Sequence, residues 1–127
     1  MAELILGLDF GTSKIGVAVG QHLTATASPI GKVRASQGKP NWVAMDRIIR
    51  EWQPNLLVVG LPLNMDSSRG DMVEAAERFA RRMQGRYKIP FEMFDERLST
   101  FEAKQHQYDD IDAGAACLIL ESWLSIH

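Results

Sequence analysis

The chain has 127 residues, 46% hydrophobic and 24% charged, which predicts a single globular domain spanning residues 1–127. Its formal net charge of −2 argues against a generally basic nucleic-acid-binding protein but leaves room for a local basic patch around an acidic centre. A single cysteine, Cys117, excludes an intramolecular disulfide. The lack of a basic leader and of a long apolar run predicts a cytoplasmic protein with no membrane partner.

The chain begins with two predicted strands. Residues 3–10 and 14–20 are rich in Ile, Leu and Val, and the short polar break at 11–13 predicts a hairpin between them. A third, weaker strand is predicted over residues 24–33. Pro29 within it indicates an edge position or a bulge, because proline cannot donate to the ladder of a central strand.

After a loop predicted over residues 36–40, helices alternate with strands. Apolar residues at helical spacing predict helices over about 41–52 and 72–83, the second with an apolar stripe that begins at Met72. The apolar run 56–59 is typical of a strand buried on both faces.

Three further elements complete the prediction: a strand over 89–94, a short helix capped by Ser99 or Thr100, and a last helix from Asp109 or Asp110 to about Leu124. A hairpin meander followed by alternating strands and helices predicts a mixed, five-stranded α/β sheet with helices on its faces.

Several acids stand where a charge is costly. Asp9 ends the first apolar strand, Asp95 and Glu96 end the last one, and Asp112 shares a predicted helix face with apolar residues. Each has a simpler explanation: Asp9 could bind turn amides, Asp95 and Glu96 could form a solvated cluster with Arg97, and Asp112 could complement the helix dipole.

Convergence of these acids on one end of the sheet predicts a carboxylate site for Mg²⁺ or Mn²⁺. Two such ions about 4 Å apart could activate water and stabilise the leaving oxygen in phosphodiester hydrolysis. Gly7 and Gly11 are expected to leave room for a phosphate. The arginines of the second predicted helix form either a solvated face or a phosphate-contacting patch: Arg78, Arg81, Arg82 and Arg86.

Four motifs, in the order DFGTSKIGVAVG, VVGLPLNMD, DERLST and IDAGAACLILESWL, closely resemble the YqgF/RuvX family of bacterial RNase H-fold proteins. Its members are described as Holliday-junction-resolvase-like nucleases and as nucleases that mature the 5′ end of pre-16S rRNA. The resemblance covers nearly the whole chain and implies an RNase H-like sheet of βββαβαβα order.

The resemblance also implies roles for individual residues. Asp9, Glu96 and Asp112 match the catalytic, metal-binding acids, with Asp95 as the alternative to Glu96. The positions expected to touch phosphate are Thr12, Lys14, Asn64 and Arg97.

One segment departs from the family pattern. Members usually carry a longer loop, rich in Gly and Lys, before the last aspartate, whereas here only residues 101–111 intervene and their sequence is acidic. Either the loop is truncated or a segment is missing from the sequence. A true truncation would remove an element that contacts the substrate.

Three functions follow as hypotheses. The first is a metal-dependent endonuclease acting on pre-16S rRNA or, alternatively, on a four-way DNA junction, as a monomer or a homodimer. The second is a non-catalytic nucleic-acid-binding factor in ribosome assembly. The third is a sugar kinase or actin-like ATPase, which also opens with Asp-x-Gly-Thr but needs two lobes, and 127 residues supply one.

Overall fold

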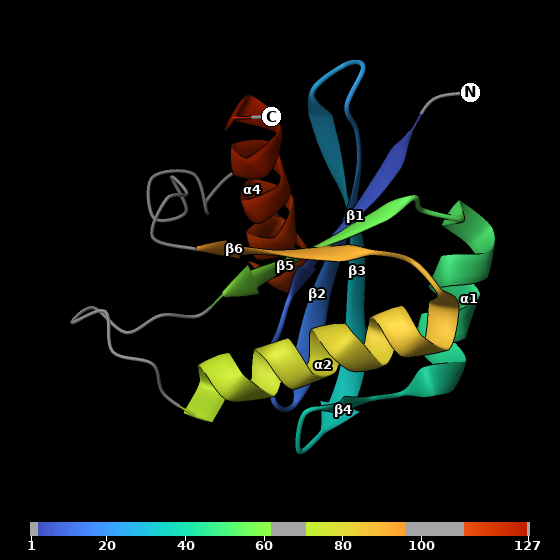
Figure 1. Ribbon diagram of the computed structural model, residues 1–127, viewed down its shortest axis with the longest axis vertical. Helices are drawn as coiled ribbons and strands as arrows, with labels where there is room; N and C mark the ends of the chain where they lie inside the picture. Colours follow the sequence, from blue (N-terminus) through green and yellow to red (C-terminus); the bar gives the residue numbers. More distant parts are fainter. Residues whose placement is uncertain (1–2, 62–70, 96–110, 127) are drawn as a thin grey trace.

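The computed structural model describes residues 3–61, 71–95 and 111–126, which form an α/β fold (Figure 1). The predicted short helix at Ser99 or Thr100 and the predicted start of the last helix at Asp109 or Asp110 lie outside the described residues. The elements are β1 (Leu4–Asp9), β2 (Lys14–Gln21), β3 (Thr26–Ser36), β4 (Lys39–Pro40), α1 (Trp42–Trp52), β5 (Leu56–Leu61), α2 (Asp71–Tyr87), β6 (Phe91–Asp95) and α4 (Ile111–Ile126).

The strands form one mixed sheet in the order β4-β3-β2-β1-β5-β6. Antiparallel hairpins join β1, β2 and β3, whereas β5 runs parallel to β1 and β6 runs parallel to β5. The predicted mixed sheet is confirmed, with one strand added. Residues 36–40 do not form a simple loop, because the chain turns at Gln37 and Gly38 and the two-residue strand β4 pairs with the end of β3.

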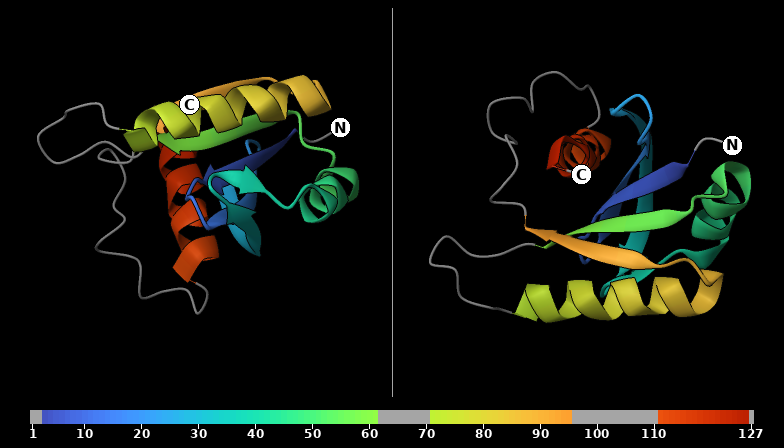
Figure 2. Two further views of the ribbon diagram at one scale, coloured as in Figure 1. Left: turned by 90° about the horizontal axis from the view of Figure 1, so that it is seen from below. Right: turned by 45° about the horizontal axis from the view of Figure 1, so that its top comes forward.

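Helices cover both faces of the sheet, and each face has its own core (Figure 2). On one face, α1 and α2 pack over a cluster that includes Leu6 and Leu8 of β1. On the other face, α4 packs over a cluster that includes Ile5. Successive residues of β1 therefore point to opposite cores, as strand geometry requires. We call these two sides of the sheet the α1/α2 face and the α4 face.

Pro29 occupies both positions that the sequence indicated. The ladder between β2 and β3 shifts register there, because Val17 pairs with Gly31 while Ala18 pairs with Pro29, leaving Ile30 as the extra residue of a β-bulge. This stretch of β3 is also an outer edge, since β4 pairs only with the last two residues of β3. The missing N–H of the proline therefore costs no ladder hydrogen bond.

Local sequence signals set both ends of α1. The Asn41 side chain caps the start of the helix by accepting hydrogen bonds from the Val43 N–H at 3.1 Å and the Ala44 N–H at 3.3 Å. Gln53 adopts a left-handed conformation, φ 46°, and its N–H bonds the carbonyl oxygen of Ile49 at 2.8 Å. Pro54 follows and cannot extend the helix.

The apolar stripe of α2 differs in phase from the prediction. Met72 is 37% exposed, whereas Val73 is fully buried together with Ala76, Phe79, Ala80 and Met83. The stripe therefore begins at Val73, and the placement of Met72 in it was wrong. The later positions were assigned correctly, because Ala76, Phe79, Ala80 and Met83 belong to both versions of the stripe.

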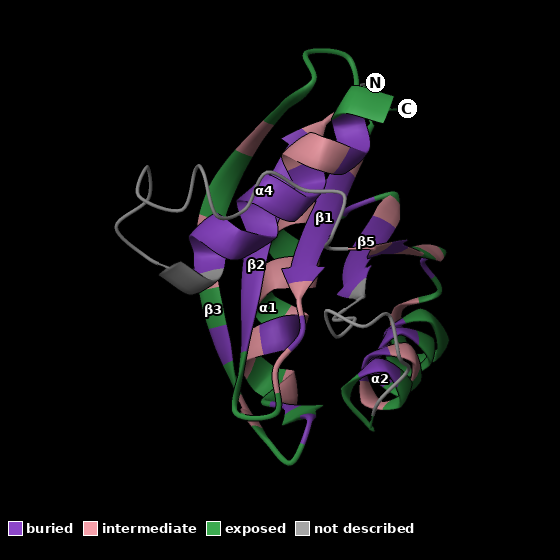
Figure 3. Ribbon diagram, turned by 90° about the vertical axis from the view of Figure 1, so that its left-hand side faces the viewer, coloured by how far each residue is buried: buried purple, intermediate pink, exposed green. Residues whose placement is uncertain are grey.

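α4 is the most apolar helix. Every residue from Ala113 to Leu120 is buried, as are Trp123 and Leu124, and Cys117 is a fully buried core residue as its neighbours predict. The sheet curls around this helix, with β1, β2 and β3 passing behind it (Figure 3). Among the described residues, no helix has the length and hydropathy needed to span a bilayer.

Candidate functional site

Two acids stand at one edge of the sheet. The strands β1, β5 and β6 are parallel, so their carboxyl ends meet at the same edge. Asp9 is the last residue of β1, Asp95 is the last residue of β6, and both are partly buried. Because β5 lies between them, the two backbones are two strand spacings apart, about 10 Å.

Strand alternation places the Asp9 side chain on the α4 face. Ile5 belongs to the core of that face, and Gly7 lies directly under α4. A Cβ atom on Gly7 would lie 3.0 Å from the carbonyl oxygen of Ala116 and 3.0 Å from the Cβ of Leu120. Asp9 is the next residue in this series. Gly7 thus makes room for a helix, and the expectation that it makes room for a phosphate is wrong.

The same alternation separates Asp95 from Asp9. Phe91 and Met93 pack against the core of the α1/α2 face, whereas Phe94 belongs to the core of the α4 face. Asp95 continues the series of Phe91 and Met93, which places its side chain on the α1/α2 face. The two acids share an edge but not a face.

The first turn of α4 begins near the carboxyl end of β1. In Figure 3 the helix starts level with the arrowhead of β1 and runs back along the strand. Asp112 is four residues, about 6 Å along the helix axis, before Ala116. Asp9 is two strand residues, about 6.7 Å, beyond Gly7, which packs against Ala116. The backbone of Asp112 is therefore on the Asp9 side of the sheet edge, while its side chain lies outside the described part of the structure.

The loop between β1 and β2 is tied to the turn between β3 and β4. The carbonyl oxygen of Thr12 accepts a hydrogen bond from the Gly38 N–H at 2.9 Å, and that of Ser13 accepts one from the Ala35 N–H at 2.8 Å. Gly38 has φ +82°, a conformation that favours glycine. Both loop carbonyls are thus satisfied inside the protein, and the loop that follows Asp9 has a fixed position.

Thr12 in this loop and Lys14, the first residue of β2, are exposed at the surface beside the carboxyl end of β1. Gly11 allows the chain to turn there, since a Cβ atom on it would lie 2.6 Å from the carbonyl oxygen of Lys14. Gly11 thus serves a tight turn, and the expectation that it leaves room for a phosphate stays a prediction. The other two predicted phosphate contacts, Asn64 and Arg97, lie outside the described residues.

Of the three predicted metal ligands, only Asp9 has a described side chain. Glu96 lies outside the described residues, and Asp112 is described only as part of helix α4. Within the described ranges, no three His, Cys, Asp or Glu residues come together to hold a metal ion. The chemistry of Asp9 fits a hard cation, since a partly buried carboxylate is the donor that Mg²⁺ and Mn²⁺ prefer.

Two further cations, both on β3, lie beside the loop, and their position is not evident from the motifs. Arg34 pairs directly across the ladder with Lys14, and Lys32 is two residues away on the same face. All three side chains are exposed. A signal for them is present in the sequence, because no Asp or Glu occurs over residues 10–45.

A cluster of electrostatic contacts lies on the α1/α2 face. Asp46 of α1 accepts two hydrogen bonds of 2.9 Å from the Arg86 guanidinium and one of 2.6 Å from the Tyr87 hydroxyl. These hydrogen bonds lower the pKa of Asp46 to about 2. Burial and its hydrogen bond to Asp46 raise the pKa of Tyr87. Arg86 also stacks 4.7 Å from the centre of the Trp42 ring, so this cluster joins α1 to α2.

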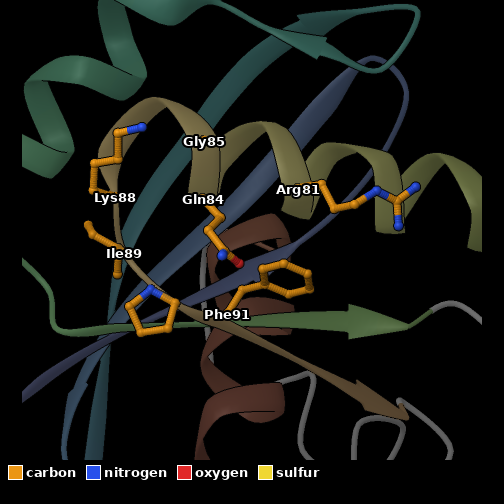
Figure 4. A pocket seen from close by; sticks show the side chains of 7 residues that line it. Arg81, Gln84, Gly85, Lys88, Ile89 and Phe91 are labelled. Atoms are coloured by element: carbon orange, nitrogen blue, oxygen red, sulfur yellow. The ribbon is translucent and has the colours of Figure 1, made fainter.

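A pocket of about 650 Å³ lies between the end of α2 and the start of β6 (Figure 4). Gln84 and Phe91 point toward each other across it, and Arg81 and Lys88 lie at its margins. Phe91 begins β6 and Asp95 ends it, so the pocket is at the opposite end of that strand from the acidic edge. We therefore separate it from the candidate site.

Two solved structures of Holliday junction resolvases share this fold. The Thermus thermophilus RuvC structure in complex with a Holliday junction substrate matches with a TM-score of 0.60 and 14% identity, covering 98% of this chain and 94% of that one. The fowlpox virus Holliday junction resolvase matches with a TM-score of 0.57 and 13% identity, covering 98% and 99%. The fold is therefore that of the RuvC-like resolvases, the RNase H-like fold that the motifs implied.

The chain belongs to the RuvX family, described as Holliday junction resolvase, which matches residues 3–126. A relative from Haemophilus ducreyi named "Putative pre-16S rRNA nuclease" is 49% identical over 97% of this chain and 96% of its own. A relative of the same name from Pseudomonas fluorescens is also 49% identical, over 96% and 92%. Both alignments extend over 133 positions, more than the 127 residues of this chain, so these relatives carry residues that this chain lacks.

Proposed function

We propose that this protein is an endonuclease that hydrolyses phosphodiester bonds of structured nucleic acid with the help of Mg²⁺ or Mn²⁺. The observation that supports the proposal is the position of Asp9. Its carboxylate ends a buried parallel strand on the α4 face, and the first turn of α4 begins beside it. Membership of the RuvX family points to the same chemistry.

We assign Asp9, Glu96 and Asp112 as the acids that hold the ions. Glu96 is preferred to Asp95 because alternation places Asp95 on the opposite face from Asp9. Two bound ions would supply an activated water and charge stabilisation for the leaving oxygen. The carboxylates would fix the position of these ions, and Thr12, Lys14, Asn64 and Arg97 would orient the phosphate.

The favoured substrate is the 5′ region of pre-16S rRNA, because relatives that are nearly half identical over almost their full length carry that name. Such a substrate would place the protein in the cytoplasm. The family description instead favours a four-way DNA junction, for which a homodimer would supply two symmetric cuts.

One assay separates the two substrates. Purified protein is incubated with a pre-16S rRNA fragment and with a four-way DNA junction, each with Mn²⁺ or with EDTA. We expect metal-dependent cleavage of the rRNA fragment at a discrete position. Preferred cleavage of the junction would reverse the substrate assignment, and the mass of the protein in solution would then be expected to show a dimer.

A non-catalytic role in ribosome assembly is the second candidate. It is favoured by the shorter chain, since residues present in the relatives are missing here. In that case the protein would bind the rRNA fragment but leave it intact in both Mg²⁺ and Mn²⁺. Cleavage that disappears in Asp9→Asn would reject this alternative.

A further inference from the structure

Four exposed cations gather at one corner of the sheet, where β2, β3 and β4 meet. Lys14 pairs with Arg34, Lys32 follows on β3, and Ser36 pairs with Lys39. Ile15 and Val33, the neighbours of these residues, point into the core of the α1/α2 face. The cations therefore share the α4 face. We call this set the basic corner: Lys14, Lys32, Arg34 and Lys39.

The arrangement of charges in the basic corner is unfavourable for the stability of the sheet. Like charges directly opposite each other on neighbouring strands destabilise the pair, yet Lys14 stands opposite Arg34. The stretch from residue 10 to residue 45 contains these four cations but neither Asp nor Glu, although the whole chain has 16 acids. Such a concentration of one charge in a protein of net charge −2 indicates an anionic partner.

The basic corner and Asp9 lie in line across the sheet. Asp9 pairs with Gly16, and Gly16 pairs with Lys32. The three residues share the α4 face, and the middle one has no side chain to separate the outer two. Two strand spacings put the Cα atoms of Asp9 and Lys32 about 10 Å apart. In Figure 3 the ends of β2 and β3 beyond the start of α4 are not covered by that helix.

The corner is also held in place before any ligand arrives. The hydrogen bonds from Ala35 and Gly38 to the β1–β2 loop tie Lys14 to the end of β3. A preorganised set of cations binds a polyanion with a smaller entropic cost than cations on loose loops.

We propose that the basic corner binds the sugar-phosphate backbone of the nucleic acid and leads it across β3 and β2 to Asp9. This inference rests on the proposed nuclease function, and it adds a direction of approach and the residues Lys32, Arg34 and Lys39. The arginines of α2 are the competing surface, and they lie on a helix that packs on the opposite face.

Binding of a labelled RNA hairpin with a single-stranded 5′ extension tests the proposal. Affinity is measured over a series of salt concentrations, with Ca²⁺ in place of Mg²⁺ and Mn²⁺. The test variant is Lys32→Gln/Arg34→Gln. The matched control is Arg78→Gln/Arg82→Gln, which removes the same charge from exposed positions of α2. Circular dichroism melts verify that both variants are folded.

We expect the test variant to bind more weakly and to lose about 1.4 to 1.8 from the magnitude of the slope of log K against log salt, as two lost phosphate contacts predict. The control should keep the wild-type slope. An unchanged slope in the test variant, with the loss seen in the control, would overturn the basic corner while leaving the nuclease proposal intact. A wild-type protein that neither binds nor cleaves the RNA would reject the proposed function itself.

Discussion

Asp9 occupies the last position of β1, where the strand leaves the core and its carboxylate is partly buried on the α4 face. A negative charge in such a place is costly unless something balances it. Asp95 has the same position on β6 but faces the other side. The two acids therefore allow a test in which one residue is the control for the other.

For Asp9→Asn we expect a loss of metal response. Saturation with Mn²⁺ at 100 times Kd should stabilise the wild type by about 2.7 kcal/mol, whereas the variant should gain little. Without metal, the variant should be at least as stable as the wild type, because the proposed site then holds one negative charge fewer. Thermal melts with EDTA and with Mn²⁺ measure both effects, and cleavage should fall by at least 100-fold.

Asp95→Asn serves as the matched control. Because its side chain lies on the α1/α2 face, we expect the metal-induced rise in melting temperature and the cleavage rate to stay near the wild-type values. A variant of Asp95 that loses the metal response while Asp9→Asn keeps it would show that the assignment of the ligands is reversed.

Asp46 has a predictable acid response. Its pKa is lowered from 3.8 to about 2 by hydrogen bonds from Arg86 and Tyr87, so the folded state favours the ionised form. The stabilisation is complete above the unfolded pKa and is lost as the pH falls through the folded one. Between about pH 4 and pH 2, the melting temperature of the wild type should fall more steeply than that of Asp46→Asn. Parallel curves over this range would contradict the contribution of this carboxylate.

At the scale of the element, α2 is a helix whose apolar stripe the sequence leaves ambiguous at its start. Met72 and Val73 are both apolar, and either one continues the spacing of the later stripe residues to within one position. Packing against the sheet selects Val73, which is fully buried, and leaves Met72 at the surface.

Two charge substitutions test this phase. Val73→Asp should destabilise the protein by about 3 kcal/mol or more, because it buries an unpaired charge. Met72→Asp should change the free energy of unfolding by less than about 0.5 kcal/mol, since position 72 is exposed and the new acid lies in the first turn of a helix, where a negative charge is favourable. Urea unfolding of both variants gives the comparison. Equal losses of stability would show that the helix is rotated relative to its position here.

The apolar pattern of α4 does not show which face of the helix a residue lies on. Asp112 was selected because it shares a helical face with apolar residues, but nearly all sides of this helix are buried. A residue of an all-round apolar helix lies on an apolar face whichever way the helix turns. The backbone position of Asp112 near the end of β1 supports the choice better than the stripe does.

At the scale of the whole molecule, the strands and helices of the described residues, apart from the two-residue β4, could be predicted to within a few residues because local signals agree: strand propensity, Asn41 as a cap and proline at element ends. The basic corner could not be predicted from the sequence, because it forms only when β3 pairs with β2 and brings Arg34 opposite Lys14. The side chain of Asp9 could be placed at a sheet edge from sequence, but its face depends on where α4 packs.

The two cores share one sheet, so we expect them to unfold together. Trp42 and Trp52 pack against the core of the α1/α2 face, and Trp123 belongs to the core of the α4 face. One variant retains only Trp123, through Trp42→Phe/Trp52→Phe, and a second carries Trp123→Phe. Within each variant, fluorescence and circular dichroism should give the same urea midpoint. Different midpoints would show that the two cores unfold independently, which would contradict the predicted single domain.

The hydrogen bonds between the β1–β2 loop and the β3–β4 turn have a consequence for amide exchange with solvent. The two hairpin turns of β3 are both on the surface, but the Gly38 and Ala35 amides donate to Thr12 and Ser13. Deuterium should therefore enter these two amides slowly, on the time scale of sub-global opening. At the other turn, Leu23 is 85% exposed, and its amide should exchange within the first time points. The protein thus keeps its low-stability turn at the end of the sheet away from Asp9.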